Sequence, residues 1–219
     1  MRLLRIPGVH EPLSDTWLLA DAMIAEGVAG RDVADLCCGT GVLAIAASRA
    51  GARSVEAVDV SLRATVATAV NARMHRCRVR VHRGDLFGAL GGLSVDMIVC
   101  NPPYVPAETD ELPRHRATTP LDGGRDGRAL IDRVCTEAAS HLRPRGAVLI
   151  VQSSICDAAR TLDMLAASGL EAAEVRRVRG RLGPVMRARR PMLQLRGLLG
   201  EDDHEDLVVL RGTRSPPLP

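Results

Sequence analysis

The chain alternates between short runs rich in valine and isoleucine and longer stretches rich in alanine and leucine, and this alternation restricts the folds that it can adopt. A β-branched run favours a strand, whereas a long alanine- and leucine-rich stretch favours a helix. Strands that alternate with helices predict a mostly parallel sheet covered by helices on both faces. The run 94–101, SVDMIVCN, is almost continuously apolar, as a strand buried on both faces should be.

The pattern predicts seven strands, at residues 32–38, 54–60, 78–84, 94–101, 146–152, 170–180 and 205–212. Four helices are predicted between them, at residues 41–51, 61–75, 127–142 and 156–169, with Ser61 as the N-cap of the second. We therefore expect one doubly wound α/β domain at residues 1–212. The remaining residues 213–219, TRSPPLP, are expected to form a flexible tail.

In such sheets a ligand binds beyond the carboxyl ends of the strands, and three polar stretches fall there. The first is DLCCGTG, residues 35–41, whose glycines 39 and 41 allow a tight turn and a close approach of a ligand to the backbone. The second is Asp59, which can accept both hydroxyls of a ribose. The third is GDLF, where Asp85 can accept a hydrogen bond from an adenine amino group.

The only tyrosine of the chain stands in a fourth stretch, Asn101-Pro102-Pro103-Tyr104, directly after the apolar run. The Asn101 side-chain carbonyl and the Pro102 carbonyl can both accept hydrogen bonds from one NH₂ group. The two prolines hold these acceptors in place, and the ring of Tyr104 offers a flat face to an amide or a base. The stretch therefore predicts a holder for a planar amino or amide nitrogen.

The glycine-rich turn alone leaves another interpretation open, because GTGVLA also fits the loose G-x-G-x-x-G/A pattern of dinucleotide-binding proteins. A hydride-transfer enzyme needs groups that polarise a carbonyl or an alcohol. Asn101 to Tyr104 supply neither a good acid nor a good base, which argues against it.

Composition excludes several other classes. The six cysteines show no CxxC pair and no matching histidine spacing, so we expect no metal site. The amino-terminal stretch is too short in apolar residues for a signal peptide, and no apolar run is long enough to span a membrane, so we expect a cytoplasmic protein.

Arginine is the only strongly basic residue in the chain, and it clusters at residues 73–83 and 176–190. Such clusters suit a phosphate-rich surface, but they also occur on ordinary solvated faces.

Together, DLCCGTG, Asp59, GDLF and NPPYVP resemble the class I methyltransferases that use S-adenosylmethionine. The NPPY stretch is typical of those that methylate amide or exocyclic amino nitrogens. Two further stretches, VHEPLSDTWLLADAM (9–23) and GGRDGRALIDRV (123–134), resemble the HemK/Mtq2-type protein glutamine N5-methyltransferases. The resemblance implies a Rossmann-like seven-stranded sheet with an antiparallel last strand, an N-terminal segment (1–30) that covers the cofactor, and a Gly-Gly-Gln loop of a translation termination factor as substrate.

Carried over to this sequence, the resemblance also implies roles for individual residues. The residues expected to contact S-adenosylmethionine are Thr16, Asp35, Cys37, Gly39, Gly41, Asp59, Asp85, Leu86 and Asn101. The residues expected to hold the acceptor amide are Asn101, Pro102, Pro103 and Tyr104.

The chain departs from the family pattern at three positions. Cys37 replaces a glycine, so its backbone must either avoid positive φ or bear strain, and His10 and Ser14 replace a tyrosine and a glutamate. About thirty residues precede the first strand in this sequence, so we expect no separate recognition domain there. Substrate recognition is then expected from the arginine-rich C-terminal third, from the loop 107–119, or from a second subunit such as the small zinc-binding activator of eukaryotic relatives.

Two other functions stay open at this point. An adenine amino methyltransferase acting on RNA or DNA would use the same holder, although the chain has few aromatic residues on which bases could stack. An RNA- or ribosome-binding protein that retains the fold without activity is the non-enzymatic alternative.

Overall fold

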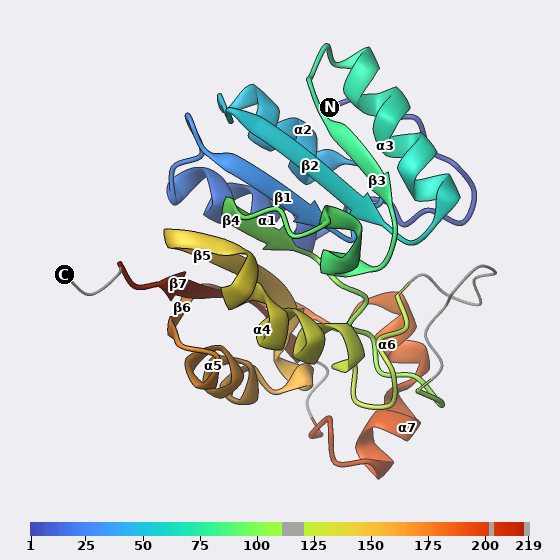
Figure 1. Ribbon diagram of the computed structural model, residues 1–219. Coiled ribbons are helices and arrows are strands. Elements are labelled where there is room, and N and C mark those ends of the chain that lie inside the picture. Colours follow the sequence, from blue (N-terminus) through green and yellow to red (C-terminus); the bar gives the residue numbers. More distant parts are fainter. Residues whose placement is uncertain (111–120, 202–203, 217–219) are drawn as a thin grey trace.

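The computed structural model describes residues 1–110, 121–201 and 204–216 and contains one seven-stranded sheet (Figure 1). The strands are β1 (Asp32–Leu36), β2 (Ser54–Asp59), β3 (Arg80–Arg83), β4 (Val95–Cys100), β5 (Leu142–Ser153), β6 (Leu170–Arg181) and β7 (His204–Arg214). Their order across the sheet is β3-β2-β1-β4-β5-β7-β6. The strands from β3 to β5 pair in parallel, whereas β7 lies antiparallel between β5 and β6. This arrangement confirms the expected doubly wound α/β fold with an antiparallel last strand.

Helices cover both faces of the sheet, with α2 and α3 on one side and α4 and α5 on the other (Figure 1). The α-helices are α1 (Ser14–Ala25), α2 (Val42–Arg49), α3 (Leu62–Met74), α4 (Ala129–His141), α5 (Ala158–Ala167), α6 (Pro184–Ala188) and α7 (Arg190–Leu195), and the two 3₁₀ turns are η1 (Leu86–Leu90) and η2 (Ser154–Cys156). Ser61 caps α3 as expected, since its hydroxyl accepts a hydrogen bond from Ala64 N.

The alternation of side chains along the strands divides the core into two layers. In β4, Met97 and Val99 pack with residues of α1 and α2, whereas Ile98 and Cys100 pack with residues of α4 and α5. All four side chains are fully buried. A strand that is apolar on both faces is what the run SVDMIVCN predicted.

Three parts of the chain differ from the sequence-based expectation. Helix α1 lies in the N-terminal segment, and α6 and α7 lie in the C-terminal third, where we predicted no helix. Strand β7 continues through Thr213 and Arg214, because they pair with Glu171 and Leu170 of β6, so the expected tail begins two residues later. Of the expected recognition loop 107–119, residues 111–119 lie outside the described residues.

Each arginine cluster overlaps an edge strand of the sheet: β3 contains Arg80 and Arg83, and β6 contains the arginines of the other cluster up to Arg181. On β3, Arg80 forms an ion pair with the buried Glu56. On β6, Arg177 contacts Glu174 and Asp206 at 2.5 and 2.6 Å. Charged side chains on an exposed edge oppose pairing with another chain, which gives these clusters a structural explanation.

Candidate active site

A cavity of about 1710 Å³ opens at the carboxyl edge of the parallel strands. Its walls come from the turns after β1, β2, β3 and β4, from the N-terminal segment before α1, and from the start of α6. Because doubly wound sheets bind ligands at this edge, the cavity lies where the sequence predicted a site.

Strand order places the predicted residues in a row. Asp85 follows β3, Asp59 ends β2, the turn 37–41 follows β1, and Asn101 follows β4, in the order in which these strands neighbour one another. Neighbouring strands lie about 4.8 Å apart, so the row extends over about 14 Å. The site therefore suits an elongated ligand lying across the strand ends.

Asp59 is held by two backbone N–H groups. Gly39 N donates to its Oδ2 at 3.0 Å, and Ser61 N donates to its Oδ1 at 2.9 Å. Burial raises the pKa of this carboxyl, and the two hydrogen bonds oppose that rise. Each oxygen keeps a second lone pair, so the carboxylate can accept two hydroxyl groups from the cavity.

The glycine-rich turn places some of its residues in the cavity and others behind it. Cys37 and Gly39 line the cavity, whereas Gly41 does not. Gly41 has a φ of +81°, and a Cβ added there would approach Thr68 Cγ2 to 2.8 Å, so this glycine is needed for packing against α3. Cys37 has a φ of 60°, so its backbone adopts the left-handed conformation, which is strained in a residue other than glycine.

Asp35 lies beneath the turn and is not part of the cavity wall. Its Oδ2 accepts a hydrogen bond from Ala44 N in the first turn of α2 at 2.9 Å, whereas its buried Oδ1 has no partner among the described residues. Burial raises the pKa of this fully buried carboxyl to about 8. The side chain therefore positions the turn and the start of α2 from behind.

Asp85 and Leu86 line the far end of the row. The Asp85 side chain is 61% exposed and pairs with Arg133 of α4 at 3.0 Å. It makes no capping bond to η1. Leu86 has a φ of 46°, while its side chain is buried in the core against β4 and α4. Only its backbone is therefore available to a ligand.

Four side chains at the other end of the row form a continuous hydrogen-bonded chain. The Tyr104 hydroxyl donates to Asp15 Oδ2 at 2.9 Å, and the Thr16 hydroxyl donates to Asp15 Oδ1 at 3.2 Å. Asn101 Nδ2 in turn donates to Thr16 Oγ1 at 3.1 Å. Burial, together with the charge of Asp15, raises the pKa of Tyr104 well above its ordinary value, so the phenol stays protonated and continues to donate.

This chain of bonds fixes the orientation of the Asn101 carboxamide. Since Nδ2 faces Thr16, Oδ1 points the other way and has no hydrogen-bond donor in the part of the chain that the structure describes. Asn101, Pro102, Pro103 and Tyr104 all line the cavity. The four residues that the sequence singled out therefore lie together in the cavity wall, with the Asn101 carboxamide held in one orientation.

The backbone of Pro103 and Tyr104 is supported from behind by the stretch that begins α4. A Cβ on Gly123 would approach Pro103 O to 2.6 Å and Tyr104 Cα to 2.9 Å, so only glycine fits there. Cys156 Sγ donates to Tyr104 O at 3.0 Å. The glycines of the GGRDGR stretch therefore allow a close backbone approach that holds the tyrosine in place.

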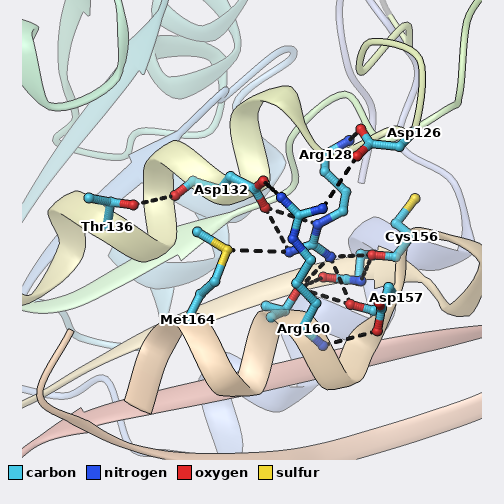
Figure 2. A network of polar contacts seen from close by, with 10 residues as sticks. Asp126, Arg128, Asp132, Thr136, Cys156, Asp157, Arg160 and Met164 are labelled. Carbon is cyan, nitrogen blue, oxygen red and sulfur yellow. Dashed lines mark hydrogen bonds and ion pairs between the residues drawn. The ribbon is translucent and has the colours of Figure 1, made fainter. Parts of the chain in front are cut away.

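Arg128 fixes the residues around Cys156 (Figure 2). Its buried guanidinium contacts the carbonyl oxygens of Cys156 and Asp157, and it pairs with Asp132 at 2.7 Å. Arg160 approaches the same aspartate from solvent at 2.5 Å. The network joins α4, η2 and α5 directly behind the tyrosine turn.

Sequence reasoning missed two carboxylates of the cavity wall. Asp15 lies inside the stretch 9–23, next to Thr16, but nothing in its spacing indicated that it links Thr16 to Tyr104. Glu205 is the second residue of β7 and belongs to the acidic stretch 201–206 of the sequence, where it could not be told from a surface residue. Strand order alone brings it to the cavity.

Comparisons with known proteins agree with this geometry. Residues 14–114 match the methyltransferase small domain family. A Methanocaldococcus jannaschii protein, provisionally named a protein N5-glutamine methyltransferase, is 33% identical over 165 residues, which cover 75% of this chain and 82% of that protein. The chain belongs to the protein N5-glutamine methyltransferase family. It is thus a methyltransferase, and the resemblance noted in its sequence is confirmed.

Two further proteins resemble this chain, one in sequence and one in fold. The ribosomal protein uL3 glutamine methyltransferase of Bradyrhizobium diazoefficiens is 42% identical over 137 residues, 59% of this chain but only 43% of that longer enzyme. Among solved structures, the E. cuniculi Mtq2–Trm112 complex, described as methylating the termination factor eRF1, aligns with a TM-score of 0.65 and 23% identity over 95% of this chain and 99% of that one. The second likeness shows the fold. No helix within the described residues is long and apolar enough to cross a membrane.

Proposed function

We propose that this protein transfers a methyl group from S-adenosylmethionine to the side-chain amide nitrogen of a glutamine in a protein of the translation machinery. The observation that supports the proposal is the orientation of Asn101 in the cavity wall, where Nδ2 donates to Thr16 and Oδ1 accepts no hydrogen bond from the described residues. A ribosomal protein or a termination factor as acceptor agrees with the names of the relatives, and either would place the reaction in the cytoplasm.

The residues of the row fit the cofactor. The chemistry of the donors and acceptors follows the parts of S-adenosylmethionine in order: Asp85 and the Leu86 backbone for the adenine, Asp59 for the ribose hydroxyls, and the turn 37–41 for the amino-acid part. The two positive φ angles at Cys37 and Leu86 flank this row, and strained backbone of this kind clusters at ligand sites. We include Asp35 and Gly41 as residues that shape the turn.

When bound, the cofactor supplies an electrophilic methyl group, so the protein contributes alignment and electrostatics more than acid–base chemistry. Asn101 Oδ1 and the Pro102 carbonyl each accept a hydrogen bond from one of the two N–H groups of the acceptor NH₂. An amide nitrogen is a poor nucleophile because its lone pair is delocalised, and holding both hydrogens favours a geometry in which the lone pair points outward. Tyr104 supports the plane of the amide, and the displaced proton leaves to water.

The adenine alternative is less favoured by the surroundings of the acceptor end. Asp15 and Glu205 place two carboxylates in the wall near Tyr104, and their charge would repel the phosphates next to a target base. In the arginine cluster 176–190, Arg177, Arg187 and Arg189 direct their guanidinium groups to partners within the chain. These arginines are therefore poorly placed to form a nucleic-acid surface.

The test is a labelling experiment with radioactive S-adenosylmethionine and three separate acceptors: a termination factor with a Gly-Gly-Gln loop, a uL3-type ribosomal protein, and total RNA. We expect label in one of the proteins, recovered as N5-methylglutamine after digestion, and loss of that label when the acceptor glutamine is changed to asparagine. Label recovered as methyladenosine from the RNA would overturn the proposal.

A small activator subunit is a further part of the proposal, since the aligned Mtq2 structure is a complex with Trm112. Activity of the purified chain without any partner would remove this part and leave the proposed reaction unaffected.

A further inference from the structure

Glu205 lies at the acceptor end of the cavity with half of its carboxylate engaged. The residue is 9% exposed, and Gly183 N donates to its Oε1 at 3.1 Å. Across the described ranges 1–110, 121–201 and 204–216 this is the only hydrogen bond of the Glu205 carboxylate, and the carboxylate forms no ion pair there. The other oxygen, Oε2, accepts no hydrogen bond from the described residues, and the residue lines the cavity, so the carboxylate can bind a donor or a cation that enters there.

The surroundings identify which part of the cavity Glu205 faces. The same wall contains Tyr104, Pro184, Val185 and Met186, which lie beyond the cofactor row. Burial is the main cause of the raised pKa of Tyr104, and the charges of Asp15 and then Glu205 add to it, so Glu205 lies within electrostatic range of the ring. A carboxylate in this wall, near the acceptor holder and with one oxygen free of hydrogen bonds from the described residues, is positioned to contact a substrate that enters the cavity.

The neighbouring charges favour a cation over a neutral donor. Asp15 has both oxygens engaged, by Thr16 and Tyr104, and it adds negative charge near the tyrosine. The nearby arginines of the segment between β6 and β7 point elsewhere: Arg187 donates to Leu182 O, and Arg189 pairs with Asp122. Glu205 is therefore available to pair with a positively charged group of the substrate.

We propose that Glu205 is a specificity-determining residue, which binds a lysine or arginine side chain that lies close to the methylated glutamine in the acceptor protein. The inference rests on the proposed function and adds a substrate preference to it. Its apolar neighbours Val185 and Met186 would cover the aliphatic part of such a side chain, while the carboxylate meets the charged end.

The test uses synthetic 15-residue peptides with a central Gly-Gly-Gln, in which one lysine is moved through the three positions on either side of the glutamine. At each position a methionine peptide and a glutamate peptide provide the comparison. For the wild-type protein we expect one lysine peptide whose kcat/KM is at least about 10-fold above that of its methionine counterpart. The gain should come from a lower KM and not from a higher kcat. The glutamate peptide should be the poorest of the three.

In Glu205→Gln, which keeps the size and the bond from Gly183 N, this lysine preference should fall to about 1-fold. The Kd for S-adenosylhomocysteine and the kcat on the methionine peptide should stay within about 2-fold, which also shows that the variant folds. Glu171→Gln, at the far end of β6, is the control and should keep the preference.

Methylation of the glutamine without a charge preference at any position, or a preference that survives in Glu205→Gln, overturns this inference alone. If neither the peptides nor the intact termination factor and uL3-type protein are methylated, the proposed function fails, and this inference fails with it.

Discussion

At the scale of single residues, the proposed reaction depends on a few side chains that position the acceptor nitrogen. Asn101 was identifiable from the sequence because of its place before two prolines. Its orientation was not, because it is set by Thr16 and Asp15 from a helix about 85 residues earlier in the chain. Leu86 and Asp35 show the converse: the sequence marked both positions, but only the structure shows that Leu86 offers its backbone and that Asp35 lies behind the turn.

Replacement of Asn101 by alanine is the first prediction at this scale. Because Oδ1 is proposed to accept a hydrogen bond from the acceptor nitrogen during transfer, we expect kcat to fall at least about 100-fold. The Kd for S-adenosylmethionine, measured by calorimetry, should change by less than about 5-fold. Equal losses in both quantities would argue against the role as a holder.

At the scale of elements, the ends of helices and strands carry the site. The seven strands and helices α2 to α5 were predictable because apolar runs alternate so regularly with alanine-rich stretches, whereas α1 was not predicted. Helices α6 and α7 were not, because each is only five or six residues long and lies in an arginine-rich segment without a clear apolar period. Their positions depend on tertiary contacts, such as Arg189 with Asp122.

The network behind Tyr104 gives a second prediction. Arg128→Met removes a buried guanidinium and leaves the carbonyls of Cys156 and Asp157 without a donor, so it should lower the free energy of unfolding by about 2–4 kcal/mol. Arg160→Met removes a half-exposed partner of the same Asp132 and should cost less than about 1 kcal/mol. Urea unfolding measures both. Equal effects would mean that the network does not depend on burial.

The start of α2 gives a third prediction, on pH. The pKa of Asp35 rises from its ordinary 3.8 to about 8 on folding because of burial. The folded state therefore binds this proton more tightly than the unfolded state. The stability that the group contributes is fully present below about pH 4 and is lost as the pH rises through about 8.

The Asp35→Asn variant has no ionisable carboxyl group at this position, so its stability lacks this dependence on pH. Between pH 5 and pH 8, the ligand-free wild type should lose stability relative to the variant, by at most about 1.4 kcal/mol for each pH unit. Urea unfolding at the two pH values measures the difference. Parallel pH profiles for the two proteins would show that Asp35 is already ionised in the fold.

At the scale of the whole molecule, the sheet order joins separate predictions into one site. The sequence indicated which residues follow the strands, and the order β3-β2-β1-β4 then places them in a row. The antiparallel insertion of β7 between β5 and β6 brings Glu205 to the same cavity. No local pattern encodes that placement, which explains why the sequence indicated the polar residues at the strand ends but not Glu205.

Binding of a ligand along this row should stabilise the whole domain, which is the fourth prediction. S-adenosylhomocysteine at 100 times its Kd adds about 2.7 kcal/mol, and for a domain of this size that corresponds to a rise in Tm of about 5–10 °C. Asp59→Ala should raise the Kd about 10- to 100-fold, so the shift at the same ligand concentration should fall to about half or less. An unchanged shift in Asp59→Ala would show that this carboxylate does not bind the ribose.

The central claim is that Asn101 grips the amide nitrogen that becomes methylated. The most direct measurement is the crystal structure of the protein with S-adenosylhomocysteine and a glutamine-containing acceptor peptide. The account predicts that the glutamine nitrogen lies about 2.9 Å from Asn101 Oδ1, with the amide plane against Tyr104 and the nitrogen facing the sulfur. A glutamine bound elsewhere, or an Asn101 whose Oδ1 has turned toward Thr16, would contradict it.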